Sequence, residues 1–128
     1  VMLEADVETH GFVNREAGGN GYDCLSNHIW PCANPDWKHI FVERMQRAYN
    51  RDKNHTCIFS WSLGNESGFG ENSIAMIDYL RNNDSKRLIH SCDASNAADL
   101  SHLYGETGKE YALIPDMYSK MYESINGK

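Results

Sequence analysis

The chain has 128 residues, a length that suits one ordinary domain. Its residues are 41% hydrophobic and 23% charged, which is typical of a globular protein and excludes a disordered or membrane-spanning chain. No apolar segment approaches transmembrane length, so we expect no membrane as a partner. The formal net charge of -6 argues against nucleic acid, because phosphate contacts need clustered Lys and Arg. Neutral ligands and metal ions remain possible.

The chain ends and the cysteines bear on origin and compartment. The chain has no initiator Met and ends without an evident stop, so we expect a piece of a larger protein, and its start does not resemble a signal peptide. The four cysteines form no zinc-binding spacing; Cys24 and Cys32 could bridge a loop, but reduced thiols are the default. Cys57 lies in an apolar run and is expected to pack as a small hydrophobic residue. We expect a cytoplasmic protein.

Residues 1–11 are predicted to form a strand that ends in polar groups. Alternation along an extended chain puts Glu8 and His10 on one side of that strand. An acid and an imidazole in this arrangement can bind one hard or borderline cation, with further ligands supplied from elsewhere. The alternative is a solvated strand end, because two ligands do not make a closed metal site.

A long loop over residues 12–35 is followed by a predicted helix. An amide, a proline and an acid at residues 34–36 are typical of a helix start. A polar return over residues 50–55 then leads to the next strand. The apolar residues that recur at helical spacing, and that we expect in the core, are Trp37, Ile40, Phe41, Met45 and Ala48.

The second half of the chain repeats the alternation of strand and helix. Ser73 is predicted to cap a second helix, a polar turn follows over residues 81–87, and residues 88–91 form a short strand. A last apolar piece, residues 111–118, is predicted to be another strand. This order predicts an α/β fold with a parallel sheet and right-handed crossovers.

The central segment is residues 56–68, an apolar run that ends on an amide and an acid. The apolar half, residues 56–63, is typical of a parallel strand covered on both faces. Functional side chains in parallel α/β folds follow the strand ends, so Asn65 and Glu66 form a candidate active site. The alternative is that these two polar residues merely open a loop.

Four motifs stand in order along the chain, at residues 4–11, 51–55, 61–68 and 117–118. These motifs resemble those of the bacterial β-galactosidases of glycoside hydrolase family 2. The Glu-Thr-His-Gly and Ser-Leu-Gly-Asn-Glu-Ser-Gly forms resemble the β-galactosidase branch more than the related β-glucuronidases or β-mannosidases. The resemblance implies that residues 1–128 are one fragment of a (β/α)8 TIM barrel catalytic domain, roughly strands 3 to 6 with the intervening helices.

The resemblance also implies residue roles and a reaction, the retaining hydrolysis of terminal β-D-galactosides such as lactose by double displacement. Glu66 matches the general acid/base, Asn65 the contact to the sugar 2-hydroxyl, and Tyr118 a hydrogen-bond donor to the nucleophile. Glu8 and His10, together with Glu66, match the ligands of a Mg²⁺ ion.

No part of the chain matches the family's nucleophilic glutamate, which is expected beyond Lys128, on the seventh strand. Glu110 and Tyr111 form a Glu-Tyr pair, but they precede the motif of Tyr118, whereas the nucleophile should follow it. The preferred interpretation is therefore a β-galactosidase fragment that carries the acid/base half of the site and is inactive alone. We expect it to associate with the remainder of the parent chain or to form a homo-oligomer. The alternative is a non-catalytic metal- or sugar-binding α/β module derived from such an enzyme.

Overall fold

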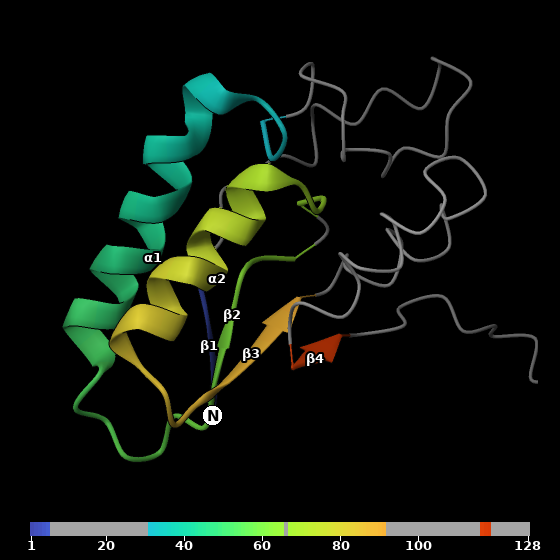
Figure 1. Ribbon diagram of the computed structural model, residues 1–128. Coiled ribbons are helices and arrows are strands. Elements are labelled where there is room, and N and C mark those ends of the chain that lie inside the picture. The colour runs from blue at the N-terminus through green and yellow to red at the C-terminus, as the bar shows by residue number, and fades with distance from the viewer. Residues whose placement is uncertain (6–30, 66, 92–115, 119–128) are drawn as a thin grey trace, which may run out of the picture.

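The computed structural model of the protein describes residues 1–5, 31–65, 67–91 and 116–118. Two α-helices lie side by side on one face of a small sheet (Figure 1). Neither of these described helices has the length and apolarity needed to cross a membrane. In chain order the elements are β1 (Met2–Glu4), the 3-10 helix η3 (Pro35–Trp37), α1 (Lys38–Asp52), β2 (Ser60–Ser62), α2 (Glu71–Asn83), β3 (Leu88–Ser91) and β4 (Met117–Tyr118).

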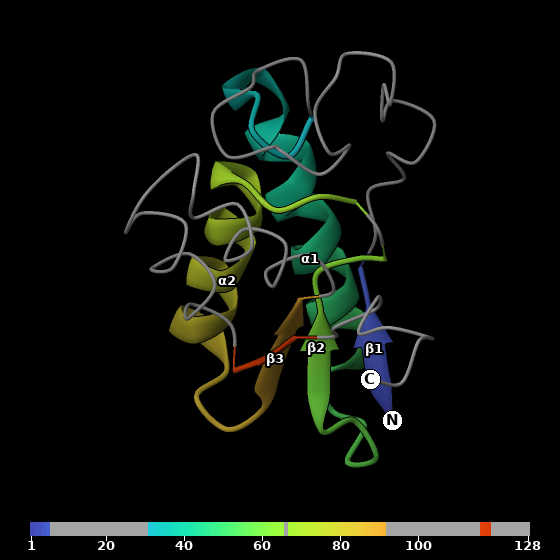
Figure 2. The same ribbon diagram turned by 90° about the vertical axis from the view of Figure 1, so that its right-hand side faces the viewer.

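All strand pairs within the described residues are parallel. The strand order is β1-β2-β3-β4, so each strand pairs with the next one along the chain. Figure 2 shows β1, β2 and β3 pointing the same way in front of the two helices. Helix α1 lies between β1 and β2 in the chain, and α2 lies between β2 and β3. Each helix returns the chain to the same edge, so these strands run parallel. The α/β prediction with a parallel sheet is confirmed, and the carboxyl ends of the strands meet at one edge.

The core lies between the sheet and the helices. Trp61 of β2 is fully buried, and its ring meets that of Tyr49 of α1 edge to face, with the centroids 5.6 Å apart. Leu3 and Ile89 pair with Trp61 in register and pack on the same side. All of β2 is buried, as predicted for a covered strand. The helices contribute the buried side chains Phe41, Met45, Met76, Ile77 and Leu80.

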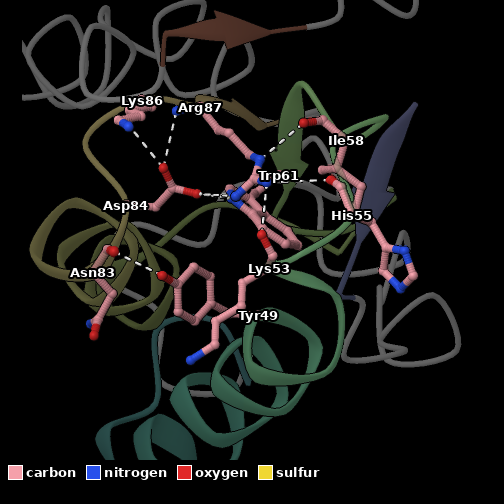
Figure 3. A network of polar contacts seen from close by, with 9 residues as sticks. All are labelled: Tyr49, Lys53, His55, Ile58, Trp61, Asn83, Asp84, Lys86 and Arg87. Atoms are coloured by element: carbon pink, nitrogen blue, oxygen red, sulfur yellow. Dashed lines mark hydrogen bonds and ion pairs between the residues drawn. The ribbon is translucent and has the colours of Figure 1, made fainter.

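A polar network anchors the amino end of β2 (Figure 3). The Arg87 guanidinium pairs with the Asp84 carboxylate at 2.8 Å and lies over the Trp61 ring, 5.4 Å from its centroid. The indole Nε1–H of Trp61 donates to the same carboxylate at 3.0 Å. Arg87 also donates to three backbone carbonyl oxygens of the turn before β2, so one side chain ties this turn to the start of β3. Those oxygens belong to Lys53, His55 and Ile58.

This network predicts a loss of stability in acid. Burial alone would raise the pKa of Asp84, but hydrogen bonds from Trp61, Arg87 and the backbone lower it to about 2. The pKa of Asp84 is lower in the folded protein than in the unfolded chain. The ionised carboxylate therefore stabilises the fold fully above the unfolded pKa, and this stabilisation disappears as pH falls toward 2. We expect about 2 kcal/mol of unfolding free energy to be lost between pH 5 and 2 through this group. Urea unfolding of wild type and Asp84→Asn at several pH values measures this loss. If the free energy of unfolding has the same pH dependence in both proteins, Asp84 is not its source.

The first helix starts as predicted and ends later. The Asn34 side chain accepts a hydrogen bond from the Asp36 amide at 3.0 Å, and Pro35 occupies the first turn. The expectation that Trp37 lies in the core is wrong, since it is 36% exposed. Trp37 belongs to η3, whose tighter turn takes it off the apolar face of α1. Helix α1 continues to Asp52, so the polar return begins later than predicted.

The second helix begins two residues before Ser73, at Glu71. Ser73 is not its N-cap: Gly70 takes that position, and the Ser73 hydroxyl accepts from the Gly70 amide at 3.2 Å. A side chain at Gly70 would place a Cβ 2.7 Å from the Cys32 carbonyl oxygen, so the close approach explains the glycine. The helix runs on to Asn83, past the predicted start of the polar turn. The strand predicted over residues 88–91 is confirmed.

The central strand is shorter than the apolar run that predicts it. β2 comprises only Ser60–Ser62, and the chain before it forms the turn that Arg87 binds. Cys57 is exposed and Phe59 is 52% exposed, so the expectation that Cys57 packs as a hydrophobic residue is wrong. The carbonyls that accept from Arg87 hold this segment in turns at the end of the sheet, where Cys57 and Phe59 are exposed while Ile58 packs in the core. Cys32 is a buried thiol, whereas Cys24 lies outside the described residues.

Candidate functional site at the carboxyl edge of the sheet

The predicted site residues follow the strands at one edge of the sheet. Asn65 comes three residues after the end of β2 and is exposed. Gly64 and Gly68 have φ angles of 151° and 80°, values that favour glycine, and these allow the chain to turn sharply on both sides of the candidate residues. The turn therefore presents Asn65 to solvent at the strand end, where a TIM barrel carries its functional groups.

The sheet brings the strands of the other predicted site residues to the same edge. Tyr118 lies in β4, which pairs with β3, so one strand separates it from β2. β1, which precedes Glu8 and His10 in the sequence, is the other neighbour of β2. Glu8, His10 and Glu66 themselves lie outside the described residues. Within the described ranges, no group of three or more His, Cys, Asp or Glu side chains could hold a metal ion.

The loop that carries Asn65 is held at both ends. Before it, Leu63 donates its backbone amide to the His90 carbonyl at 3.1 Å. After it, the buried Asn72 side chain donates to two backbone carbonyls, those of Pro31 at 2.7 Å and Asn34 at 2.6 Å. Both amide hydrogens of Asn72 are therefore used. These contacts fix the start of α2, and with it the end of the loop.

Replacing Asn72 should weaken this anchor. Asn72→Ala removes the side-chain donor of the buried Pro31 carbonyl, which is left unsatisfied, and one of two donors to the half-buried Asn34 carbonyl, which keeps the Trp37 amide. We expect the free energy of unfolding to fall by about 2 kcal/mol or more. Urea unfolding measures the change, and Asn82→Ala, at an exposed position of the same helix, is the control. Equal effects of the two substitutions would show that the bonds of Asn72 carry no special stability.

A row of three polar side chains crosses the face of the sheet turned away from the helices. Ser62 donates its hydroxyl proton to the Glu4 carboxylate, with the oxygens 3.1 Å apart, and its Oγ lies 3.0 Å from His90 Nδ1. Burial lowers the pKa of His90, while the nearby charge of Glu4 acts in the opposite direction. None of these three residues was among the site residues predicted from the sequence. Alternation on either side of Trp61 would have placed Ser62 on the face away from the core.

A groove of about 760 Å³ lies between β1 and α1. Glu4 and Ala5 line it on the side of the sheet. Asn65, the predicted site residue whose side chain the structure describes, does not line it. The remaining lining residues come from α1: Ile40, Glu43, Arg44, Arg47, Ala48 and Arg51.

Residues 1–127 match the family described as glycosyl hydrolases family 2, TIM barrel domain. The chain belongs to this family. The membership predicted from the four motifs is thus confirmed, and the parallel strands with their helices are part of a TIM barrel domain. The strand ends described above form the edge at which TIM barrel enzymes carry their active sites.

The relatives of this family 2 domain are much longer proteins. A β-galactosidase of Arthrobacter sp. (strain B7) is 43% identical over 90 residues, which are 70% of this chain and 8% of that protein. A β-galactosidase of Priestia megaterium is 34% identical over 122 residues, 89% of this chain and 11% of that protein. The β-galactosidase large subunit of Lactobacillus acidophilus is 36% identical over 70% of this chain, which spans 14% of that protein. The chain therefore corresponds to a small part of each relative.

Proposed function

We propose that this chain is part of a retaining β-galactosidase and carries the acid/base half of its active site, on roughly strands 3 to 6 of the barrel. The observation that carries the proposal is the position of Asn65 just after a buried parallel strand of a family 2 TIM barrel domain, with Glu66 as the next residue in the sequence. The identity to proteins named β-galactosidase supports the substrate class.

In the proposed reaction, Glu66 as the free acid protonates the glycosidic oxygen while the bond from that oxygen to the anomeric carbon breaks. A second carboxylate, about 5 to 5.5 Å from the first, attacks the anomeric carbon and forms a glycosyl-enzyme. Glu66, now ionised, takes a proton from the water that releases the sugar. We assign to Asn65 the contact with the sugar 2-hydroxyl, and to Tyr118 a hydrogen bond to the nucleophile. The nucleophile comes from a part of the parent protein outside this chain.

Glu8, His10 and Glu66 would hold Mg²⁺ in this site. Two carboxylates are hard ligands suited to that ion, and an imidazole can complete the set. When bound, the ion would help to orient Glu66 and would tune its pKa between the acid step and the base step. If this assignment is right, His10→Ala weakens Mg²⁺ binding to the full-length protein in calorimetry; unchanged affinity would remove His10 from the ligand set.

The remainder of the parent chain is the partner we propose for the face of the sheet that is turned away from α1 and α2. Met2 and Leu88 lie in one register row with Ser60 on the face away from the helices, and both are more than 40% exposed. Apolar side chains in this position suit an inner barrel face that further strands cover. A homo-oligomer of the parent and a cytoplasmic location complete the proposal, with neither nucleic acid nor membrane as partner.

Hydrolysis by the full-length protein tests the proposal. We expect turnover of nitrophenyl β-galactoside, and much less of the matching β-glucuronide and β-mannoside. Residues 1–128 alone should give no turnover, because protonation without a nucleophile opens no glycosyl-enzyme route. A full-length protein that binds galactose or Mg²⁺ but hydrolyses none of these substrates would favour the non-catalytic module instead.

A further inference from the structure

The row formed by Glu4, Ser62 and His90 lies directly below the ends of three strands. Glu4 pairs with Ser62, and Ser62 with His90, in the last register rows of β1 with β2 and of β2 with β3. Ser62 is 0% exposed and His90 is 6% exposed. Backbone bonds continue just above the row, from Ala5 to the Ser62 carbonyl at 3.0 Å. The side chains therefore add a second connection between strands at the level where the loops begin.

The proton order in this row follows from its chemistry. An ionised carboxylate only accepts hydrogen bonds, so the single hydroxyl proton of Ser62 goes to Glu4. The Ser62 oxygen then accepts from Nδ1–H of His90, which fixes the ring as the Nδ1–H tautomer. This order does not suit a nucleophilic serine, because the carboxylate contacts the hydroxyl and does not orient the imidazole. The row can hold strands in place but is not built to attack a substrate.

We propose that Glu4, Ser62 and His90 are positioning residues for the β-galactosidase reaction. They connect the ends of β1 and β2, after which the proposed metal ligands and acid/base follow in the sequence, to the end of β3. The inference rests on the proposed function.

The placement of the row along the sequence supports this role. Ser62 precedes Asn65 by three residues, and Glu4 precedes Glu8 by four. His90 pairs in register with Met117, the neighbour of Tyr118. A shift of one strand against another would displace Glu66 relative to groups on the neighbouring strands. Displacements of about 1 Å are enough to slow an enzyme roughly a hundredfold.

Ser62→Ala in the full-length protein tests the inference, with Ser60→Ala as the matched control. Ser60 lies in the same strand on the same face, is equally buried, and its hydroxyl has no hydrogen-bond partner within the described residues. Both substitutions remove one buried oxygen, but only Ser62→Ala removes the hydrogen bonds to Glu4 and His90. Ser62→Thr keeps the hydroxyl and should restore most of the lost rate.

The readout is kcat/KM for two β-galactosides, an alkyl galactoside with a poor leaving group and a dinitrophenyl galactoside that needs no proton. If the row positions Glu66, Ser62→Ala lowers kcat/KM at least about tenfold for the alkyl substrate and less than about threefold for the activated one, while Ser60→Ala changes neither. A loss of folded protein would lower both values equally. Equal lowering, or no change in Ser62→Ala, overturns this inference alone; a wild type without activity overturns the proposed function as well.

Discussion

Glu66→Gln in the full-length protein is expected to lower kcat/KM for alkyl β-galactosides by about 10² to 10⁴. The glutamine cannot give a proton to the departing oxygen, and a poor leaving group needs that proton in the transition state. A dinitrophenyl group leaves without a proton, so kcat/KM for its galactoside should change little. Azide should raise the turnover of this activated substrate, because it attacks the glycosyl-enzyme without help from a general base.

The control for this experiment is Glu71→Gln. Glu71 is an exposed acid at the start of α2, five residues further along the chain, and its replacement should leave both substrates unaffected. If Glu66→Gln slows activated and poor leaving groups equally, and azide gives no rescue, Glu66 is not the acid/base.

Arg87→Met is expected to lower the free energy of unfolding by about 3 kcal/mol. Methionine fills much of the volume but leaves the Asp84 carboxylate buried without its cation. It also removes the donors for three carbonyls of the turn before β2 and the cation over the Trp61 ring. Urea unfolding followed by tryptophan fluorescence measures the loss.

Arg51→Met is the matched control for that substitution. Arg51 also pairs with an acid, Asp52, but its side chain is 73% exposed, so water and salt screen the pair. We expect little change in stability. Similar losses in both variants would show that the burial and the carbonyl contacts of Arg87 do not matter.

Local chemistry made part of the fold predictable from the sequence. The helix start at Asn34 and Pro35 depends on a side chain that accepts a hydrogen bond from the Asp36 amide, two residues along the chain. Such a cap needs only neighbouring residues, so the sequence predicts it. The strand over residues 88–91 lies between a polar turn and a polar segment, and its bounds are correct. The parallel sheet followed from the alternation of strands and helices.

Tertiary contacts explain the predictions that were wrong. Cys57 belongs to an apolar run, yet Arg87, thirty residues later, binds the turn around it and shortens the strand. Trp37 fits the helical stripe but falls in a 3-10 turn. Ser73 has the chemistry of a cap, but the close contact of Gly70 with Cys32 sets the helix start earlier.

One part of the candidate site could be predicted from the sequence and another part could not. The strand-end position of Asn65 could be predicted, because an apolar run that stops on polar residues marks the carboxyl end of a buried strand. The row of Glu4, Ser62 and His90 could not, because its members lie far apart in the sequence and only the register of three strands aligns them. The predicted ligands Glu8 and His10 stay predictions, since they lie outside the described residues.

Proton NMR of the sugar released by the full-length protein tests most directly whether this chain belongs to a retaining β-galactosidase. Double displacement inverts the anomeric carbon twice, so an aryl β-galactoside should first yield β-galactose, which only later equilibrates with the α form. If α-galactose appears first, the mechanism is a single displacement and Glu66 has no glycosyl-enzyme to resolve. If neither anomer appears, the chain does not belong to a β-galactosidase.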